Sequence, residues 1–232
     1  MLERRPQQRG ITITELLITL ALIGLLISLI SPALLSTRDK AETAICMNQL
    51  KQLHTGWYAF SLDHQGRLVP SETDPRNTWV LSGHQDDAIT KGLLYPYIGS
   101  INTYRCPADY TAHTRSYSIN NYLGGAFIER LVTHHLDDIR KTSQTLVMLD
   151  ENDARPDYGY NPGSWLNVPS GNQWLDRPGI FHPRSTAMVF ADGHATTRIW
   201  EDNQTLSLSN VDTIPSASED LAWIQARLGI RR

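Results

Sequence analysis

Imidazole and carboxylate side chains that could bind a metal or transfer a proton stand close together near the C-terminus. His182 precedes Asp192, and His194 follows Asp192. Both residue types serve as metal ligands and as general acids or bases. Asp192 and Gly193, however, form the dipeptide that tight hairpin turns prefer, and His182 can bond the hairpin backbone. We therefore predict a turn here, with no catalytic residue and no metal ligand.

A second group consists of carboxylates that follow an apolar run. Asp150, Glu151 and Asp153 offer the oxygen ligands that Ca²⁺ prefers. Their spacing departs from a calcium-binding helix–loop–helix motif, because Ala154 stands at a ligand position and Arg155 stands where glycine is needed. We favour a solvated acidic loop without a cofactor and keep calcium as the alternative.

Cys46 and Cys106 are the two cysteines of the chain. Two thiols cannot supply a four-thiolate zinc site, but they can form one disulfide. A disulfide between Cys46 and Cys106 would close a loop of about 60 residues. By the chain-entropy model it would stabilise the fold by about 4 kcal/mol. The alternative is that each is a small buried residue with no covalent partner. The sequence leaves both alternatives open.

The whole-chain composition excludes several classes of protein. The 232 residues include 21 basic and 24 acidic side chains, for a formal charge of -3, which gives no basic surface for nucleic acid. No G-x-S-x-G, phosphate-binding loop, H-E-x-x-H or C-x-x-C motif occurs in the sequence. We predict that the protein is not an enzyme and has no nucleic-acid partner.

The most unusual composition lies near the N-terminus. Residues 11–35 read ITITELLITLALIGLLISLISPALL and hold a single charge, Glu15. As a helix this segment is roughly 37 Å long, which exceeds the hydrocarbon core of a bilayer at about 30 Å. Arg4, Arg5 and Arg9 precede it, and basic residues beside a first span keep that end in the cytoplasm. A secretory signal peptide would have a shorter apolar run and a small-residue cleavage site. We predict one transmembrane helix.

The junction RGITITEL at residues 9–16 resembles the leader junction of type IV prepilins and type II secretion pseudopilins. The resemblance implies that a prepilin peptidase cuts between Gly10 and Ile11 and methylates the new N-terminus at Ile11. It also implies that Glu15 meets the N-terminal amine of a neighbouring subunit. A buried carboxylate is tolerable when an opposite charge neutralises it.

The same resemblance implies a location and a set of partners. The protein would be a single-pass protein of the bacterial inner membrane, with its N-terminus in the cytoplasm and its head in the periplasm, alone or in a filament. Its partners would be the prepilin peptidase, other pilin-like subunits and the inner membrane.

A second resemblance concerns the rest of the chain. His182 stands ten positions before Asp192 and Gly193, an H-x9-D-G motif found near the end of many pilin-like proteins with such a leader. The segments CMNQLKQL at residues 46–53 and CPAD at residues 106–109 resemble elements of the same group. Because the activity of that group's head is obscure, this resemblance implies a category and no reaction. Some pseudopilin heads hold calcium in an acidic loop, which keeps the calcium alternative open.

The elements that must position these residues begin with a long helix. Cys46, Leu50, Leu53, Trp57 and Phe60 form an apolar stripe at helical spacing, which predicts one continuous helix to about residue 61. The resulting fold class is α+β and pilin-like, with a long N-terminal transmembrane helix packed on a head that has an antiparallel sheet. The predicted domains are a leader (1–10), a transmembrane half-helix (11–35), an extracytoplasmic half-helix (36–61) and a globular head (62–232).

Two local patterns predict strands in the head. The apolar run TLVMLD at residues 145–150 predicts a central strand. The segment TAMVFADGHATTRIW at residues 186–200 predicts a hairpin with a two-residue type I′ turn at Asp192 and Gly193. That turn would set Phe190 opposite Ala195 and Met188 opposite Thr197, with these apolar side chains on one face.

The C-terminal residues predict a short helix. Ser216 or Ser218 can cap it, and Gly229 can end it. Its apolar face would consist of Leu221, Ile224 and Leu228.

The function that we predict is that of a structural subunit, major or minor, of a type IV pilus or a type II secretion pseudopilus. Two alternatives come from other classes. A membrane-anchored ligand-binding protein would be favoured if Trp79, Trp165 and Trp174 were exposed along a groove. A tethered hydrolase that uses His182 and the acidic loop would be favoured by a deep pocket in which these groups converge.

Overall fold

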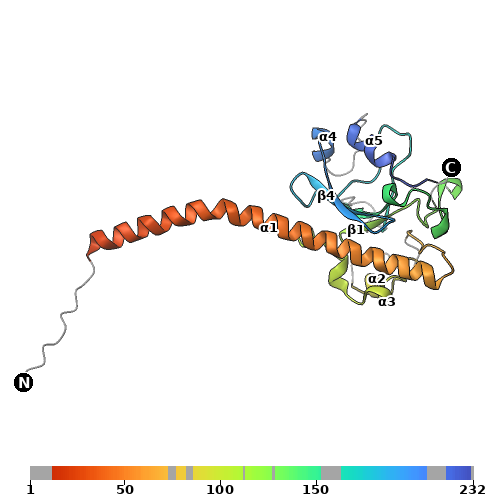
Figure 1. The fold of residues 1–232 in the computed structure, drawn as a ribbon, viewed down its shortest axis with the longest axis horizontal. Coiled ribbons are helices and arrows are strands. Elements are labelled where there is room, and N and C mark those ends of the chain that lie inside the picture. Colours follow the sequence, from red (N-terminus) through yellow and green to blue (C-terminus); the bar gives the residue numbers. More distant parts are fainter. Residues whose placement is uncertain are drawn as a thin grey trace, which may run out of the picture. The chain divides into compact units, whose positions relative to one another are not determined.

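The computed structural model of the chain describes residues 12–72, 77–81, 86–111, 113–126, 129–152, 163–207 and 218–230, and it describes no side chains at residues 30–33 and 35. Gly10, Ile11 and Asp153, for which roles are predicted, lie outside the described residues. The chain divides into two compact units, Met1–Ala41 and Glu42–Arg232 (Figure 1).

One helix, α1 (Ile13–Asp63), contributes to both units and confirms the continuous helix predicted from residue 11 to residue 61. Its first turn is closed by a capping box between Thr12 and Glu15. Glu15 Oε2 accepts hydrogen bonds from the Thr12 N–H and hydroxyl, each at 2.9 Å, and the Glu15 N–H donates to Thr12 Oγ1 at 3.2 Å. The helix ends where Gln65 and Gly66 take φ values of 58° and 86° in the left-handed region.

The helical residues of the first unit are apolar and exposed. The large apolar side chains from Ile13 to Leu29 are each more than half exposed. Among the described residues, no helix combines the length and the apolar content needed to cross a bilayer. The transmembrane segment predicted at residues 11–35 includes Ile11 and the side chains at 30–33 and 35, which lie outside the described part of the chain.

The second unit contains a five-stranded sheet in the order β3-β1-β2-β4-β5. The strands are β1 (Tyr117–Asn120), β2 (Leu146–Asp150), β3 (Ser164–Trp165), β4 (Ser185–Phe190) and β5 (Ala195–Ile199). The pairs β1/β2, β2/β4 and β4/β5 are antiparallel, whereas β3 pairs in parallel with β1, so the sheet is mixed rather than purely antiparallel. The strand predicted at residues 145–150 is β2, and it is central as expected.

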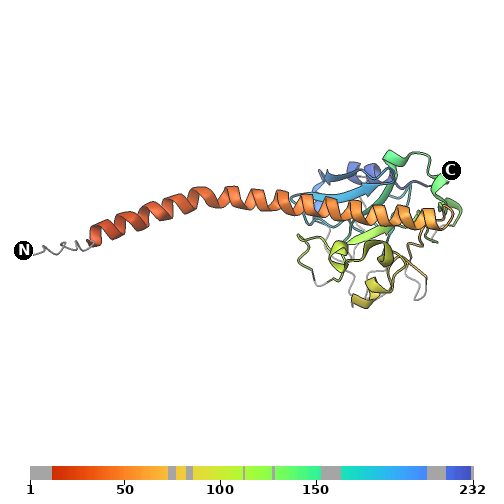
Figure 2. The ribbon, with the colours of Figure 1, turned by 60° about the horizontal axis from the view of Figure 1, so that its bottom comes forward.

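The sheet separates two apolar cores, and together with α1 it confirms the pilin-like α+β class. The first core contains the predicted stripe of α1 and side chains of the sheet, among them Val147, Ala187 and Val189. All five stripe residues are buried. From Glu42 onward α1 lies between the sheet and the segment that carries α2 (Asp86–Thr90) and α3 (Tyr95–Ile98), as Figures 1 and 2 both show.

The second core lies beneath α5 (Glu219–Gln225) and contains Leu149, Met188, Trp200, Leu221 and Ile224. Ser218 caps α5 as predicted, because its hydroxyl oxygen accepts a hydrogen bond from the Leu221 N–H at 2.9 Å. Ser216 lies outside the described residues. The remaining short helices are η1 (Ile101–Tyr104), η2 (Glu129–Leu131), η3 (Leu136–Asp138), η4 (Thr142–Gln144) and α4 (Asn203–Leu206).

The hairpin of β4 and β5 exists, but its predicted register is wrong by one residue. Val189 faces Ala195 and Met188 faces Thr196, instead of the predicted Phe190 with Ala195 and Met188 with Thr197. The connection has three residues, because the Phe190 N–H donates to the His194 carbonyl at 3.0 Å and the Gly193 N–H donates back to the Phe190 carbonyl at 2.8 Å. Gly193 alone in this turn has a positive φ, at 86°.

This three-residue loop corresponds to a turn followed by a left-handed glycine, which also favours Asp-Gly. The one-residue shift in register moves the side chains of β5 to the opposite face of the sheet. Ala195 therefore packs with the first core, whereas Met188 and Phe190 belong to the second.

Candidate functional site

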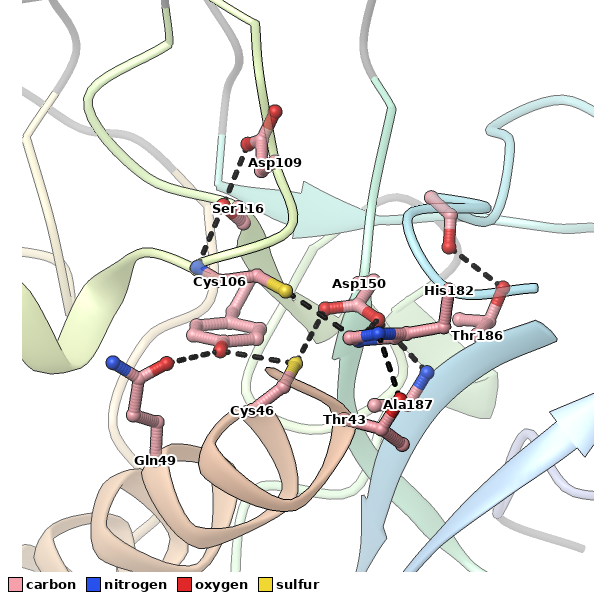
Figure 3. A network of polar contacts seen from close by, with 12 residues as sticks. Thr43, Cys46, Gln49, Cys106, Asp109, Ser116, Asp150, His182, Thr186 and Ala187 are labelled. Atoms are coloured by element: carbon pink, nitrogen blue, oxygen red, sulfur yellow. Dashed lines mark hydrogen bonds and ion pairs between the residues drawn. The ribbon is translucent and has the colours of Figure 1, made fainter. Parts of the chain in front are cut away.

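Four buried polar side chains from distant parts of the chain converge beside α1. They are Cys46 of α1, Cys106 in the loop after η1, Asp150 at the end of β2 and His182 just before β4. One potential ligand atom from each residue lies within 4.8 Å of the other three. Their exposed fractions are 0% for both cysteines and Asp150, and 3% for His182. Figure 3 shows these side chains pointing toward one another, and we call them the Cys–Asp–His cluster.

Cys46 reaches the cluster because it lies on the apolar stripe of α1, which faces the sheet. Its Sγ donates a hydrogen bond to Asp150 Oδ1 at 3.3 Å. The Tyr117 hydroxyl of β1 lies 3.2 Å from the same sulfur and 2.7 Å from Gln49 Oε1, one helical turn further along α1. Tyr117 itself is completely buried.

Cys106 is held by a compact turn that includes the CPAD segment. Its N–H donates to Ser116 Oγ at 2.9 Å, and the Ser116 hydroxyl donates to Asp109 Oδ2 at 2.6 Å. The Asp109 N–H closes the turn on the Cys106 carbonyl at 3.0 Å. These bonds place the Cys106 Sγ 3.4 Å from His182 Nε2.

Asp150 lies where the central strand ends, and both of its carboxylate oxygens are in use. Oδ1 accepts the bond from Cys46, and Oδ2 accepts a hydrogen bond from the Ala187 N–H of β4 at 2.8 Å. Oδ2 is also 3.7 Å from His182 Nε2.

His182 is oriented from both sides of its ring. Nδ1 lies 3.1 Å from the Thr43 hydroxyl of α1, and Nε2 faces Cys106 and Asp150. The backbone is fixed by a tight turn into β4, in which the Ser185 N–H donates to the His182 carbonyl at 3.1 Å and Arg184 has a φ of 51°.

Burial and the hydrogen bonds of the cluster govern its ionisation. Burial raises the pKa of Asp150 well above its ordinary value, and burial also raises the pKa of the Cys46 thiol. The pKa of Cys106 is lowered, first by a hydrogen bond from Cys46 and then by the contact with His182. Of the two cysteines, Cys106 therefore loses its proton more readily than Cys46, and its thiolate lies beside the imidazole of His182. Thiolate, imidazole and carboxylate are all metal ligands.

The structure answers the question of the two cysteines only in part. Cys46 and Cys106 lie close together, as a bridge would require, but both are free, buried thiols in this structure. The disulfide therefore stays one of two alternatives, and the alternative of two buried thiols describes the structure as it stands.

The residues of the predicted H-x9-D-G motif separate into two places. His182 belongs to the Cys–Asp–His cluster, whereas Asp192 and His194 pair with each other at the exposed hairpin turn. There, Asp192 Oδ1 accepts a bond from the His194 N–H at 3.1 Å and lies 2.6 Å from His194 Nδ1. The turn therefore accounts for Asp192 and Gly193, as predicted, and leaves His182 to a separate role.

The expectation of a solvated acidic loop is wrong for Asp150 and Glu151. Both carboxylates are buried, with exposed fractions of 0% and 1%, because β2 carries them into the interior of the sheet. Glu151 accepts a hydrogen bond from the Ser118 hydroxyl of β1. Asp153, the third calcium candidate, lies outside the described residues.

The tryptophans that could have lined a ligand groove are buried. Trp79, Trp165 and Trp174 have exposed fractions of 0%, 0% and 2% and belong to the two apolar cores. The Trp79 Nε1–H donates to the Gly163 carbonyl at 2.9 Å. These three side chains stabilise the fold and are not available to a ligand at the surface.

Sequence reasoning singled out all four members of the cluster, but under separate hypotheses. The cysteines were considered as a disulfide or as two buried thiols. Asp150 was placed in a solvated acidic loop with calcium as the alternative, and His182 in a C-terminal motif. The signal that could have joined them is the mixture of residue types, since thiolate, imidazole and carboxylate are all ligands that zinc accepts. Nothing in their spacing along the chain brings them together.

Comparisons with known proteins concern the N-terminal part of the chain. The family model of the prokaryotic N-terminal methylation motif matches residues 5–31. The type II secretion system core protein G of Klebsiella michiganensis is 31% identical over 61 residues, which cover 26% of this chain and 43% of that protein. The match thus spans less than half the length of the relative. No solved structure gives a significant match.

The match to the methylation motif fits the long N-terminal helix. Together, the two matches support a likeness to type IV pilin-like proteins and pseudopilins. The methylation motif implies membrane-anchored assembly, and the matched residues include the predicted junction at Gly10 and Ile11 together with Glu15.

Proposed function

We propose that this protein is a structural subunit, major or minor, of a type IV pilus or a type II secretion pseudopilus. A prepilin peptidase would cut after Gly10 and methylate Ile11, and the processed subunit would assemble through its N-terminal helix. The observation that carries this proposal is the match of residues 5–31 to the methylation motif, and the long helix that follows supports it.

The exposed side chains of the first unit support assembly through the helix. Large apolar side chains from Ile13 to Leu29 are each more than half exposed in the single chain. An apolar surface of this extent is stable only against lipid or against other helices. Before assembly, insertion into the inner membrane would cover this apolar surface. After assembly, packing against other pilin-like helices would cover it.

The location and partners follow from this mechanism. The N-terminus would lie in the cytoplasm, where Arg4, Arg5 and Arg9 hold it, and the second unit would lie in the periplasm. The partners would be the prepilin peptidase and other pilin-like subunits. In the proposed assembly the second unit forms the outer surface and performs no reaction.

The two alternative functions receive no support from the residues that motivated them. The ligand-binding hypothesis depended on exposed tryptophans, and Trp79, Trp165 and Trp174 are buried. The hydrolase hypothesis depended on a deep pocket in which His182 and the acidic loop converge. His182 and Asp150 do converge, but they are buried, as is Glu151, and none of them is open to a substrate.

The experiment that tests processing is intact-mass measurement of the full chain recovered from bacterial membranes. We expect a product that begins at Ile11 and carries one added methyl group. Gly10→Val should leave the chain unprocessed, whereas Gly24→Val, which changes a helical glycine with open space around it, should be processed normally. Recovery of unprocessed Met1 chain in the presence of an active prepilin peptidase would contradict the proposal.

A further inference from the structure

We propose that the Cys–Asp–His cluster is a structural zinc site, with Cys46, Cys106, Asp150 and His182 as the four ligands. The proposal concerns the second unit alone and does not depend on how the N-terminal helix is processed or assembled. It rests on the geometry of the four side chains, the chemistry of their ligand atoms and the groups that hold them in place.

The distances between ligand atoms fit a tetrahedral site. Zinc bonds of about 2.0–2.3 Å to nitrogen, oxygen and sulfur imply edges of about 3.3–3.8 Å between ligand atoms in a tetrahedron. The Cys106 Sγ to His182 Nε2 distance is 3.4 Å, and the Asp150 Oδ2 to His182 Nε2 distance is 3.7 Å. Cys46 Sγ is 3.3 Å from the other carboxylate oxygen of Asp150, Oδ1, so only one of the two Asp150 contacts can be an edge of the tetrahedron. One ligand atom from each of the four residues lies within 4.8 Å of the other three. Small side-chain movements would suffice to complete the site.

The ligand types select zinc over calcium. Ca²⁺ takes six to eight oxygen ligands, and this cluster offers one carboxylate. Two thiols with an imidazole and a carboxylate are ligands that Zn²⁺ accepts in four-coordinate sites. Because all four positions come from the protein and all are buried, the site would have no open position for substrate. The site would therefore be structural.

The surrounding groups match those of established zinc sites. A histidine ligand usually donates the hydrogen of its second nitrogen to a neighbouring acceptor, and His182 Nδ1 meets the Thr43 hydroxyl at 3.1 Å. Two thiolates and one carboxylate around Zn²⁺ leave one negative charge. The Tyr117 hydroxyl, near Cys46, and the Ala187 N–H, bonded to Asp150, are donors that would offset this charge.

A disulfide would explain fewer of these observations. It would use the sulfurs of Cys46 and Cys106 but would not account for Nε2 of His182 and the carboxylate of Asp150, which face each other beside these sulfurs. It would also remove the thiol that donates to Asp150 Oδ1, and a buried carboxylate that loses a donor is destabilising.

The proposed site would connect four segments of the second unit that are far apart in sequence. The zinc ion would join α1 to the loop before β1, to the end of the central strand β2 and to the segment that leads into β4. Because the unfolded chain does not hold these ligands together, the binding free energy of the metal would stabilise the folded unit.

The test uses the full-length chain, purified in detergent with a reductant and without a chelator. Zinc is measured per chain by elemental mass spectrometry, and Co²⁺ is titrated into metal-free protein as a spectroscopic probe. We expect one zinc ion per chain, and for cobalt the intense visible bands of a tetrahedral site together with a sulfur-to-metal charge-transfer band. The cobalt spectrum is read on the unmodified chain, so it decides the question even where a variant fails to fold.

Variants assign the ligands. Cys46→Ser, Cys106→Ser and His182→Gln should each weaken zinc binding more than tenfold. His194→Gln, which changes an exposed histidine of the hairpin, should bind zinc as the unmodified chain does.

Two results would overturn the proposal. One is reduced chain that binds zinc no more tightly than the double variant Cys46→Ser, Cys106→Ser. The other result concerns chain recovered from membranes. If both cysteines react with iodoacetamide only after reduction, and the intact mass is lower by two hydrogens, the two sulfurs form a disulfide and not a zinc site.

Discussion

The Thr43 hydroxyl and His182 Nδ1 lie 3.1 Å apart and join α1 directly to the residue that precedes β4. This contact fixes the plane of the imidazole, so that Nε2 and not Nδ1 faces Cys106 and Asp150. Thr43 is separated from Cys46 by less than one helical turn, and both therefore present their side chains to the same part of the second unit. Helix α1 thus supplies Cys46 to the cluster and, through Thr43, positions His182.

Replacement of Thr43 by valine should weaken zinc binding by about 10–100-fold, the usual effect of losing a hydrogen-bond partner of a ligand. Valine keeps the shape of threonine but cannot bond Nδ1, so the ring would lose its orientation without a loss of packing. The measurement is competition for zinc against a chromophoric chelator. Thr55→Val is the matched control, because Thr55 is an exposed residue of α1 whose hydroxyl bonds only its own helix, at Lys51. Equal zinc affinity of the two variants would show that Thr43 does not position His182 for zinc binding.

Replacement of Leu50 by alanine should destabilise the second unit by about 2–5 kcal/mol, because the side chain is completely buried in the first core and its removal leaves a cavity. Leu62→Ala is the control on the same helix, since Leu62 is 59% exposed and its truncation should change stability by less than about 0.5 kcal/mol. Urea unfolding of the full chain, followed by far-ultraviolet circular dichroism, gives both values. A small effect at Leu50 would show that the stripe of α1 does not pack on the sheet.

The elements that the sequence predicted correctly are those specified by local patterns. The stripe on α1 repeats at helical spacing, the run at β2 is continuous and apolar, and Ser218 stands directly before α5. Each of these patterns can be read within a few residues. The hairpin was predicted for the same reason, but its register was not, because Asp192 and Gly193 suit both a two-residue turn and the three-residue loop that the chain adopts.

The candidate site could not be predicted in the same way because no local pattern contains it. Cys46, Cys106, Asp150 and His182 come together only when α1 packs on the sheet and β2 lies between β1 and β4. Asp150 shows the difficulty most clearly. Next to Glu151 it suggested a solvated loop, and its burial follows from the central position of β2, which is a property of the whole sheet.

Acidification should destabilise the second unit through His54. This residue of α1 is 9% exposed, its Nε2 lies 3.3 Å from the Ala191 carbonyl, and burial lowers its pKa. A histidine with a lowered pKa in the folded state binds fewer protons than in the unfolded chain, so stability falls as the pH drops through the unfolded value of about 6.5. Asp192, which raises the pKa, opposes this effect only in part.

The measurement for His54 is the urea midpoint between about pH 7.5 and pH 5.5, spanning the unfolded pKa. His54→Gln should reduce the dependence of the midpoint on pH, because glutamine does not titrate in this range. Thr55→Val, which changes an exposed and non-titrating residue of the same helix, serves as the control and should keep the dependence of the unmodified chain. The prediction fails if the two variants show the same pH profile.

Glu15 has two separable tasks, and two substitutions distinguish them. In the single chain its carboxylate accepts hydrogen bonds from the Thr12 N–H and hydroxyl and so closes the first turn of α1. In the proposed assembly its charge would meet the N-terminal amine of a neighbouring subunit. Glu15→Gln keeps an acceptor for the capping box but removes the charge, whereas Glu15→Ala removes both.

If charge pairing drives assembly, Glu15→Gln and Glu15→Ala should both abolish filament or pseudopilus formation, while cleavage after Gly10 still occurs. If the capping box is what matters, Glu15→Gln should assemble and only Glu15→Ala should fail. Glu201→Ala, which removes an exposed carboxylate of the second unit, should assemble normally. Cross-linking of subunits in membranes, with intact mass as the readout of cleavage, separates these results. Assembly by Glu15→Ala at the level of the unmodified chain would contradict both roles, because that variant has neither the charge nor the cap.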